Sequence, residues 1–304
     1  MAASPYSLSE FWPPLPLAEW RDTCHTLHMW MQVVGKVRLE LSPHINHWWE
    51  VPLYVSARGL TTSPIPCARG IFEVDFDFIE HTLAIVTSWN ENRHLRLHSR
   101  TVADFYAHFM RELHALGIDV RIWPMPVEVP DPIRFDQDEQ HARYDPAYAH
   151  RFWRLLVTLD TIFKEFRARF LGKVSPVHFF WGSFDLACTR FSGRRAPERP
   201  DADKITRDAY SHEVISAGWW PGGGAVADAT FYAYASPEPA KFRDAHIAPK
   251  AAFYHPQLNE FILSYEDVRT CSDPRSAVLA FLESTYDAGA SLGNWDRVSL
   301  EKPL

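Results

Sequence analysis

Two histidines and two carboxylates interrupt stretches of the chain that are otherwise apolar and aromatic. His178 opens the run HFFWGSFDLACTR, which also contains Asp185, while His212 and Glu213 open the run HEVISAGWW. Because burial penalises a charge without a partner, each of these side chains needs a hydrogen-bond donor, a counter-ion or a ligand. We therefore predict that His178, Asp185, His212 and Glu213 form a catalytic centre. A structural ion pair between Asp185 and an arginine is the simpler alternative.

The cofactor of such a centre is left open, and a divalent metal is one option. Two histidines and one carboxylate, for example His178, His212 and either Asp185 or Glu213, could make a facial triad with open positions for oxygen or substrate. The metalloprotease pattern HExxH is excluded, because Ser216 stands where it requires a second histidine. The sequence also lacks a GxSxG elbow and a Walker loop, which argues against the common hydrolases and nucleotide-binding proteins.

A second set of residues is predicted to bind a small ligand. Lys36, Lys173, Arg58 and Arg190 stand at places that recur in the two halves of the chain, and they could converge on a carboxylate or phosphate near the twofold axis. Trp181 and Trp219 add flat apolar surface in a chain whose aromatic content is 14%. We expect a small anionic or aromatic molecule in an aromatic-lined cleft. The alternatives are that the cations cap helices or lie on the surface, and that the aromatic rings fill the core.

Hydrophobic periodicity predicts the elements that carry these residues. Apolar residues at steps of three and four predict helices over 17–34, 101–116 and 148–171, and a last helix that ends at Gly289. Glycines at 35, 117 and 172 are predicted to end the first three helices. Alternating or continuous apolar runs predict strands over 47–58, 71–78, 82–89, 93–98, 178–190, 212–218, 229–235 and 258–264.

The order of these elements is the same in both halves of the chain. Each half has a helix followed by Gly-Lys, then a histidine with aromatic followers, at His47 and at His178, and finally a terminal helix. We predict an α+β fold of two pseudo-twofold-related α-β-β-β-β-α repeats, with mainly antiparallel sheets flanked by helices. Chance similarity of the helix ends is the alternative. The predicted boundaries are an N-terminal arm over 1–16, repeats over 17–123 and 146–293, a linker over 124–145 and a tail over 294–304.

Composition excludes several classes of protein. The 304 residues are 46% hydrophobic, enough to bury a large core, so a disordered chain is excluded. A formal charge of -7 disfavours a nucleic-acid-binding protein. No apolar run is long enough to span a membrane and no signal peptide is recognisable, so a cytoplasmic location is expected. The cysteines lie far apart and form no CxxC pair: Cys24, Cys67, Cys188 and Cys271.

Long irregular strings of the sequence resemble the conserved blocks of a bacterial family known only as a domain of unknown function. They include "NHWWEVPLYVSARGLTTSPIP", "SPVHFFWGSFDLACTRFSGRRAP", "YSHEVISAGWWPGGG" and "AFYHPQLNEFILSYE". The resemblance runs from about residue 15 to residue 295. Because that family has no assigned activity, the resemblance implies no catalytic residue.

Three hypotheses about function remain open. The first is an enzyme or cofactor-dependent protein acting on a small molecule, and it requires the four polar residues to converge. The second is a noncatalytic binding or sensor protein that uses the same cleft, and in that case the histidines would lie apart. The third is a structural protein whose aromatic surface forms a homo-oligomer, which predicts an exposed apolar patch in place of a pocket.

Overall fold

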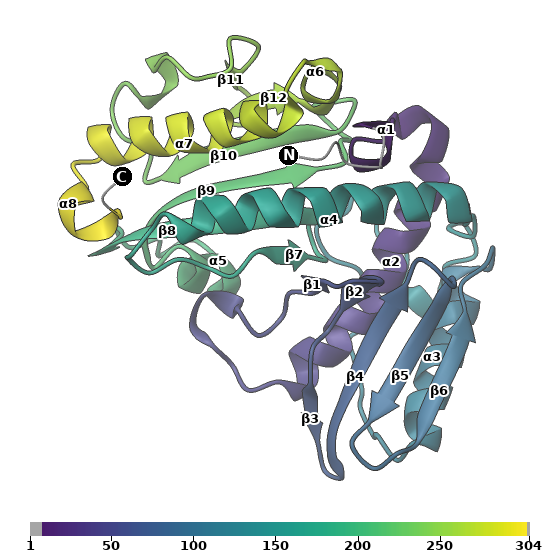
Figure 1. Cartoon of the computed structure of the whole chain (residues 1–304). Coiled ribbons are helices and arrows are strands. Elements are labelled where there is room, and N and C mark those ends of the chain that lie inside the picture. The colour runs from purple at the N-terminus through teal and green to yellow at the C-terminus, as the bar shows by residue number, and fades with distance from the viewer. Residues whose placement is uncertain (1–7, 303–304) are drawn as a thin grey trace.

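Two antiparallel sheets of six strands each, flanked by helices, make up this computed structural model, which describes residues 8–302 (Figure 1). The predicted α+β class is therefore confirmed. The sheets meet edge to edge where the backbones of Leu53 and Phe179 exchange two hydrogen bonds of 2.9 Å. One continuous core of buried apolar side chains runs through both halves.

The first sheet lies between α2 (Leu17–Leu41) and α3 (Val102–Ala115) in the chain. Its strand order is β1-β2-β4-β5-β6, with β3 paired to β4. The Thr101 side chain caps α3 by accepting a hydrogen bond from the Asp104 N–H, and Gly117 follows the helix with a φ of 75°. The strands are β1 (Tyr54–Val55), β2 (Gly59–Thr61), β3 (Ile65–Cys67), β4 (Gly70–Asp77), β5 (Thr82–Thr87) and β6 (Asn92–Arg96).

The second sheet follows α4 (Pro146–Ala168) and has the order β11-β12-β10-β9-β8-β7. Asp145 caps α4 and a proline occupies its first turn, which is a standard helix start. The strands are β7 (His178–Phe180), β8 (Asp185–Arg195), β9 (His212–Trp220), β10 (Thr230–Ser236), β11 (Phe253–His255) and β12 (Glu260–Ser264). The remaining helices are α1 (Leu8–Phe11), α5 (Lys204–Ala209), α6 (Tyr265–Thr270), α7 (Pro274–Leu292) and α8 (Arg297–Leu300).

The two faces of the second sheet have different neighbours. Helices α4 and α7 pack side by side along one face, where they contact β8, β9 and β10 (Figure 1). The opposite face carries α5 and the short 3₁₀ turn η1 (Asn46–Trp48), which contact each other. Short covering segments leave space above the strands, and that space is the cleft described below.

Several local predictions are wrong: α4 ends at Ala168, before Gly172, and α7 passes Gly289 and ends at Leu292. Three further differences have a physical cause. The first helix passes Gly35 and continues to Leu41, because the bare backbone of Gly35 lies against the Trp181 indole, where a Cβ would be 2.3 Å from Nε1. No strand starts at His47, which has a φ of 65° in η1. The run after His178 is a hairpin that turns over 181–184, with a φ of 59° at Phe184.

These differences bear on the predicted duplication. Both halves do contain a helix, an antiparallel sheet and a further helix in that order. The strand expected at His47, which was to match the one at His178, does not exist, so the internal repeat is not confirmed. Residues 1–7 of the predicted arm lie outside the described part of the chain. Among residues 8–302, no helix is long and apolar enough to cross a lipid bilayer.

Candidate functional site

A cleft of about 720 Å³ lies over the face of the second sheet that α4 and α7 leave uncovered. Its floor comes from side chains that alternate along neighbouring strands, since every second residue of a strand points to the same face. The floor residues are Asp185, Ala187, Thr189 and Phe191 of β8, Val214, Ser216 and Trp220 of β9, and Tyr232 and Tyr234 of β10.

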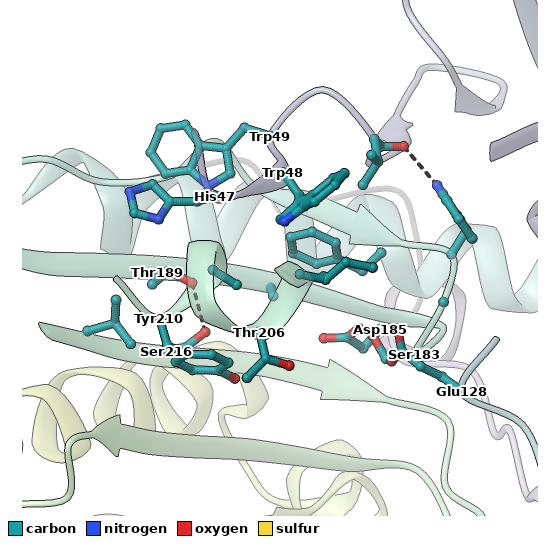
Figure 2. A pocket seen from close by; sticks show the side chains of 18 of the residues that line it. His47, Trp48, Trp49, Glu128, Ser183, Asp185, Thr189, Thr206, Tyr210 and Ser216 are labelled. Atoms are coloured by element: carbon teal, nitrogen blue, oxygen red, sulfur yellow. Dashed lines mark hydrogen bonds between the residues drawn. The ribbon is translucent and has the colours of Figure 1, made fainter. Parts of the chain in front are cut away.

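The walls and roof come from segments far apart in the sequence. Trp48 and Trp49 of the η1 region lie above the strands of the floor, and α5 lies beside them (Figure 2). Lys36 and Leu39 of α2 and Trp181 of the β7–β8 turn line another part of the wall. Both His47 and Trp48 have a positive φ, of 65° and 59°, an uncommon backbone conformation for residues with side chains. This turn therefore places two aromatic residues in the cleft at a cost in backbone energy.

Three carboxylates that line the cleft, Glu128, Asp185 and Glu260, lie close enough for Asp185 to affect the pKa of the other two, and we call them the acidic end. Asp185 is only 6% exposed and accepts hydrogen bonds from the Ser183 and Tyr232 hydroxyls, one on each carboxylate oxygen. Burial raises the pKa of Asp185. Burial and the neighbouring Asp185 also raise the pKa of Glu128, and they raise the pKa of Glu260 to about 7. Within residues 8–302, no lysine, arginine or histidine forms an ion pair with these three carboxylates.

A buried amide positions one member of the acidic end. Gln32 of α2 is fully buried, and its side chain makes two hydrogen bonds of 2.8 Å with the backbone of Val127. One bond runs from the amide nitrogen to the Val127 carbonyl, and the other from the Val127 N–H to the amide oxygen. The next residue is Glu128, which has a φ of 57° and lines the cleft. Gln32 therefore holds the backbone that carries the Glu128 carboxylate.

A row of hydroxyl groups crosses the middle of the floor. The Thr189 and Ser216 hydroxyls are 2.8 Å apart, and those of Tyr210 and Tyr234 are 2.9 Å apart. We call these four residues the hydroxyl row; three of them, Thr189, Ser216 and Tyr210, are labelled in Figure 2, between His47 and Asp185. Hydroxyls donate and accept, so this row can bond to a polar ligand of either kind.

At the Phe191 end of the floor one imidazole, His47, lines the cleft, and a lysine and a second imidazole contact it from outside the lining. His47 lines the cleft, and the Lys173 ammonium lies 2.7 Å from its Nε2 atom. The His47 ring is also 5.6 Å from the ring of His212. The Asp208 carboxylate accepts a hydrogen bond from the His47 N–H at 2.9 Å. We call His47, Lys173 and His212 the basic end.

The four residues predicted as a catalytic centre are not brought together. Asp185 is on the cleft floor, whereas the His212 ring meets the His47 ring edge to face at the other end. Glu213 points to the opposite face of the sheet and pairs with Arg194 at 2.7 Å. His178 is fully buried between the rings of Trp49, Tyr54 and Phe180, and burial lowers its pKa to about 3.

The predicted ligand-binding residues are also divided. Lys36 and Trp181 line the cleft. Arg58 lies on the first sheet and pairs with Asp77 at 2.5 Å. Arg190 and Trp219 alternate with the floor residues and point into the helix-covered face, where Arg190 pairs with Glu283 at 3.3 Å. The neighbour of Trp219, Trp220, lines the cleft in its place.

Two residues of the acidic end, Glu128 and Glu260, are not among the site residues predicted from the sequence. Glu128 lies in the segment predicted as a linker, and Glu260 lies within the strand predicted over 258–264 and is the first residue of β12. The spacing of the tyrosines in TFYAYAS indicates that Tyr232 and Tyr234 share one face of a strand, which is the face that lines the cleft. As for the metal option, no group of three or more metal-ligating side chains is found within the described part of the chain.

Comparison with known proteins identifies the family. The model of a family of unknown function (DUF5996) matches residues 12–302, and the chain therefore belongs to it. No curated protein and no solved structure matches the chain.

Proposed function

We propose that this member of a family without an assigned activity binds a small organic molecule with a flat apolar body and a basic nitrogen. One observation carries the proposal: the acidic end closes an aromatic-lined cleft, and no cation within residues 8–302 pairs with it. Separated histidines, at His178 and His212, favour the binding hypothesis over a histidine-based enzyme. The aromatic residues line a concave cleft, which favours a small ligand over an oligomer interface.

The charges of the cleft favour a cation over the anion expected from the sequence. That expectation depended on Lys36, Lys173, Arg58 and Arg190, of which only Lys36 lines the cleft. Neighbouring carboxylates, of which Asp185 is buried, resist ionisation until a positive group approaches, and an ammonium group would supply the missing charge. The rings of Trp49, Trp181 and Trp220 can contact both a flat body and the cation attached to it.

Three probes of the same shape and different charge test the proposal by isothermal titration calorimetry at pH 7.5. Tryptamine carries an ammonium, 3-ethylindole is neutral and indole-3-propionate carries a carboxylate. We expect tryptamine to bind at least tenfold more tightly than 3-ethylindole, and indole-3-propionate to bind most weakly. Equal affinity for the three probes, or a preference for the acid, would overturn the proposal.

Matched variants locate the binding site of tryptamine. Glu260→Gln removes a charge from the acidic end and breaks no hydrogen bond within the described part of the chain, so the fold should be kept. We expect it to lower the tryptamine affinity about tenfold, which corresponds to about 1.4 kcal/mol. Glu139→Gln is the control, because Glu139 is exposed and lies outside the cleft. A similar loss in both variants would place tryptamine elsewhere.

A second candidate function is acid–base catalysis in the same cleft. The observation that favours it is the pKa of Glu260, about 7, which suits a group that both accepts and donates protons at neutral pH. Its test is to incubate the protein with a mixture of small metabolites and follow their masses. Conversion of a compound by the wild type and not by Glu260→Gln would support catalysis, and no conversion by either would leave binding as the function.

A further inference from the structure

Asp185 of the acidic end and the basic end lie far apart along the floor of the cleft. Asp185 of the acidic end and Phe191 beside the basic end are on the same strand, β8, six positions apart. A strand rises about 3.3 Å per residue, so about 20 Å separates the two positions. Phe191 donates its backbone N–H to the carbonyl of Lys173 at 3.0 Å, which places Lys173 at that end. Figure 2 shows His47 and Asp185 at opposite sides of the hydroxyl row.

The contacts of His47 show that Lys173 is the cation of the basic end. The Asp208 carbonyl, 3.1 Å from the His47 Nδ1 atom, can only accept, so Nδ1 carries the proton. Nε2 is then free to accept from the Lys173 ammonium, and His47 is neutral. Lys173 lies 5.1 Å from the ring centre of Trp49 and 5.0 Å from that of Phe191. Within residues 8–302, no carboxylate lies within ion-pair distance of Lys173, although Asp208 is nearby.

The part of the cleft between the two ends suits a chain that alternates polar and apolar groups. The hydroxyl row offers donors and acceptors on the floor, as a peptide backbone requires. Trp48, Trp49 and Ile205 offer apolar surface opposite the floor, where side chains of a bound peptide could pack. A single amino acid is too short to reach both ends, because one residue spans at most about 3.6 Å.

We infer that the ligand is an extended peptide of about four to six residues, with its free N-terminal ammonium at the acidic end and its free C-terminal carboxylate at Lys173. The length follows from the separation of the ends: it is about 20 Å, or about 14 Å once an ion-pair contact of about 3 Å is subtracted at each terminus, and four to six extended residues span about 13 to 20 Å. This inference rests on the proposed function, because it identifies the basic nitrogen of the ligand as a peptide N-terminus.

Binding of the peptide Ala-Tyr-Ala-Tyr-Ala, measured by calorimetry, tests the inference. We expect the pentapeptide with free ends to bind, and N-terminal acetylation or C-terminal amidation each to lower its affinity at least tenfold. In the series from the dipeptide to the heptapeptide, we expect affinity to peak at four to six residues. Absence of binding by the free pentapeptide, or affinity that is independent of length, would overturn the inference.

A variant of the basic end tests whether Lys173 is the residue that recognises the C-terminal carboxylate of the peptide. Lys173→Met keeps the apolar stem of an exposed residue and removes its charge, and Lys250→Met is the control outside the cleft. We expect amidation to change the affinity about tenfold in the wild type and in Lys250→Met, and less than twofold in Lys173→Met. Lys173→Arg should restore most of the effect. An unchanged effect of amidation in Lys173→Met would overturn the inference.

The two proposals fail in different ways. If tryptamine binds at the acidic end and acetylation weakens the peptide while amidation does not, the proposed function stands and the peptide inference fails. If tryptamine does not bind and acetylation has no effect, both fail.

Discussion

Replacing Glu260 by glutamine should make the protein more stable, and only at neutral and alkaline pH. Burial and the Asp185 carboxylate raise the pKa of Glu260 from 4.5 to about 7 on folding. Between these two values the unfolded chain has lost the proton and the folded chain keeps it. The free energy of unfolding therefore falls as the pH rises from about 4.5 to about 7, and it is constant above that range.

The size of the effect follows from the two pKa values. A difference of this size amounts to about 3 kcal/mol at pH above 7, and partial exposure of the side chain reduces it to about 2 kcal/mol. Glutamine has nearly the same shape and no charge, so Glu260→Gln removes this cost. At pH 4.5 the unfolded side chain is half ionised, so the variant should equal the wild type within about 0.5 kcal/mol, and well below that pH Glu260 is protonated in both states.

Urea denaturation of the wild type and Glu260→Gln, at pH 4.5 and pH 8.5, measures the difference. We expect equal free energies of unfolding, within about 0.5 kcal/mol, at pH 4.5 and a variant more stable by about 2 kcal/mol at pH 8.5. Glu139→Gln, which replaces an exposed carboxylate, should show no such change. A variant that is less stable than the wild type at pH 8.5 would refute the reasoning, because Glu260 would then have a stabilising partner.

Three other substitutions test separate parts of the structure. His178→Phe should keep the stability at pH 7 within about 1 kcal/mol, because both ring nitrogens of His178 lack a hydrogen-bond partner among residues 8–302. Since burial lowers the pKa of His178 from 6.5 to about 3, the wild type loses stability as the pH falls below 6.5, and at pH 5 the variant should gain about 2 kcal/mol relative to it. Gly218→Ala should cost about 1–3 kcal/mol and abolish tryptamine binding in calorimetry, because its Cβ would lie 2.3 Å from the Tyr232 ring. Gln32→Leu should cost about 2 kcal/mol in urea denaturation, because it leaves the Val127 backbone without its two hydrogen bonds.

The fold class and most elements could be predicted because they depend on local patterns. Helices predicted over 101–116 and 148–171 correspond to α3 and α4, and the predicted strand over 71–78 corresponds to β4. Apolar residues that recur every two positions in a strand, or about every 3.6 positions in a helix, indicate which face of the element is buried. This holds whatever element packs against that face. The burial expected for Asp185 also came from this pattern, and the structure places it at 6% exposure.

Prediction of the site failed where a single backbone conformation decided which side chains meet. The sequence from His178 to Arg190 fits one long strand equally well, but the turn over 181–184 folds it into a hairpin. In that hairpin His178 lies opposite Ala187, packed between aromatic rings, and Asp185 faces the cleft.

The amino-acid sequence by itself determined which residues are buried and which elements they form, since burial follows from apolar spacing within one segment. Only the tertiary structure decided which polar groups became neighbours. Glu128, Asp185 and Glu260 come from a loop, β8 and the start of β12, and they line one cleft because the order of the sheet places β8, β9, β10 and β12 side by side beneath it. Contacts between residues so distant in the chain depend on strand order, which no local pattern records.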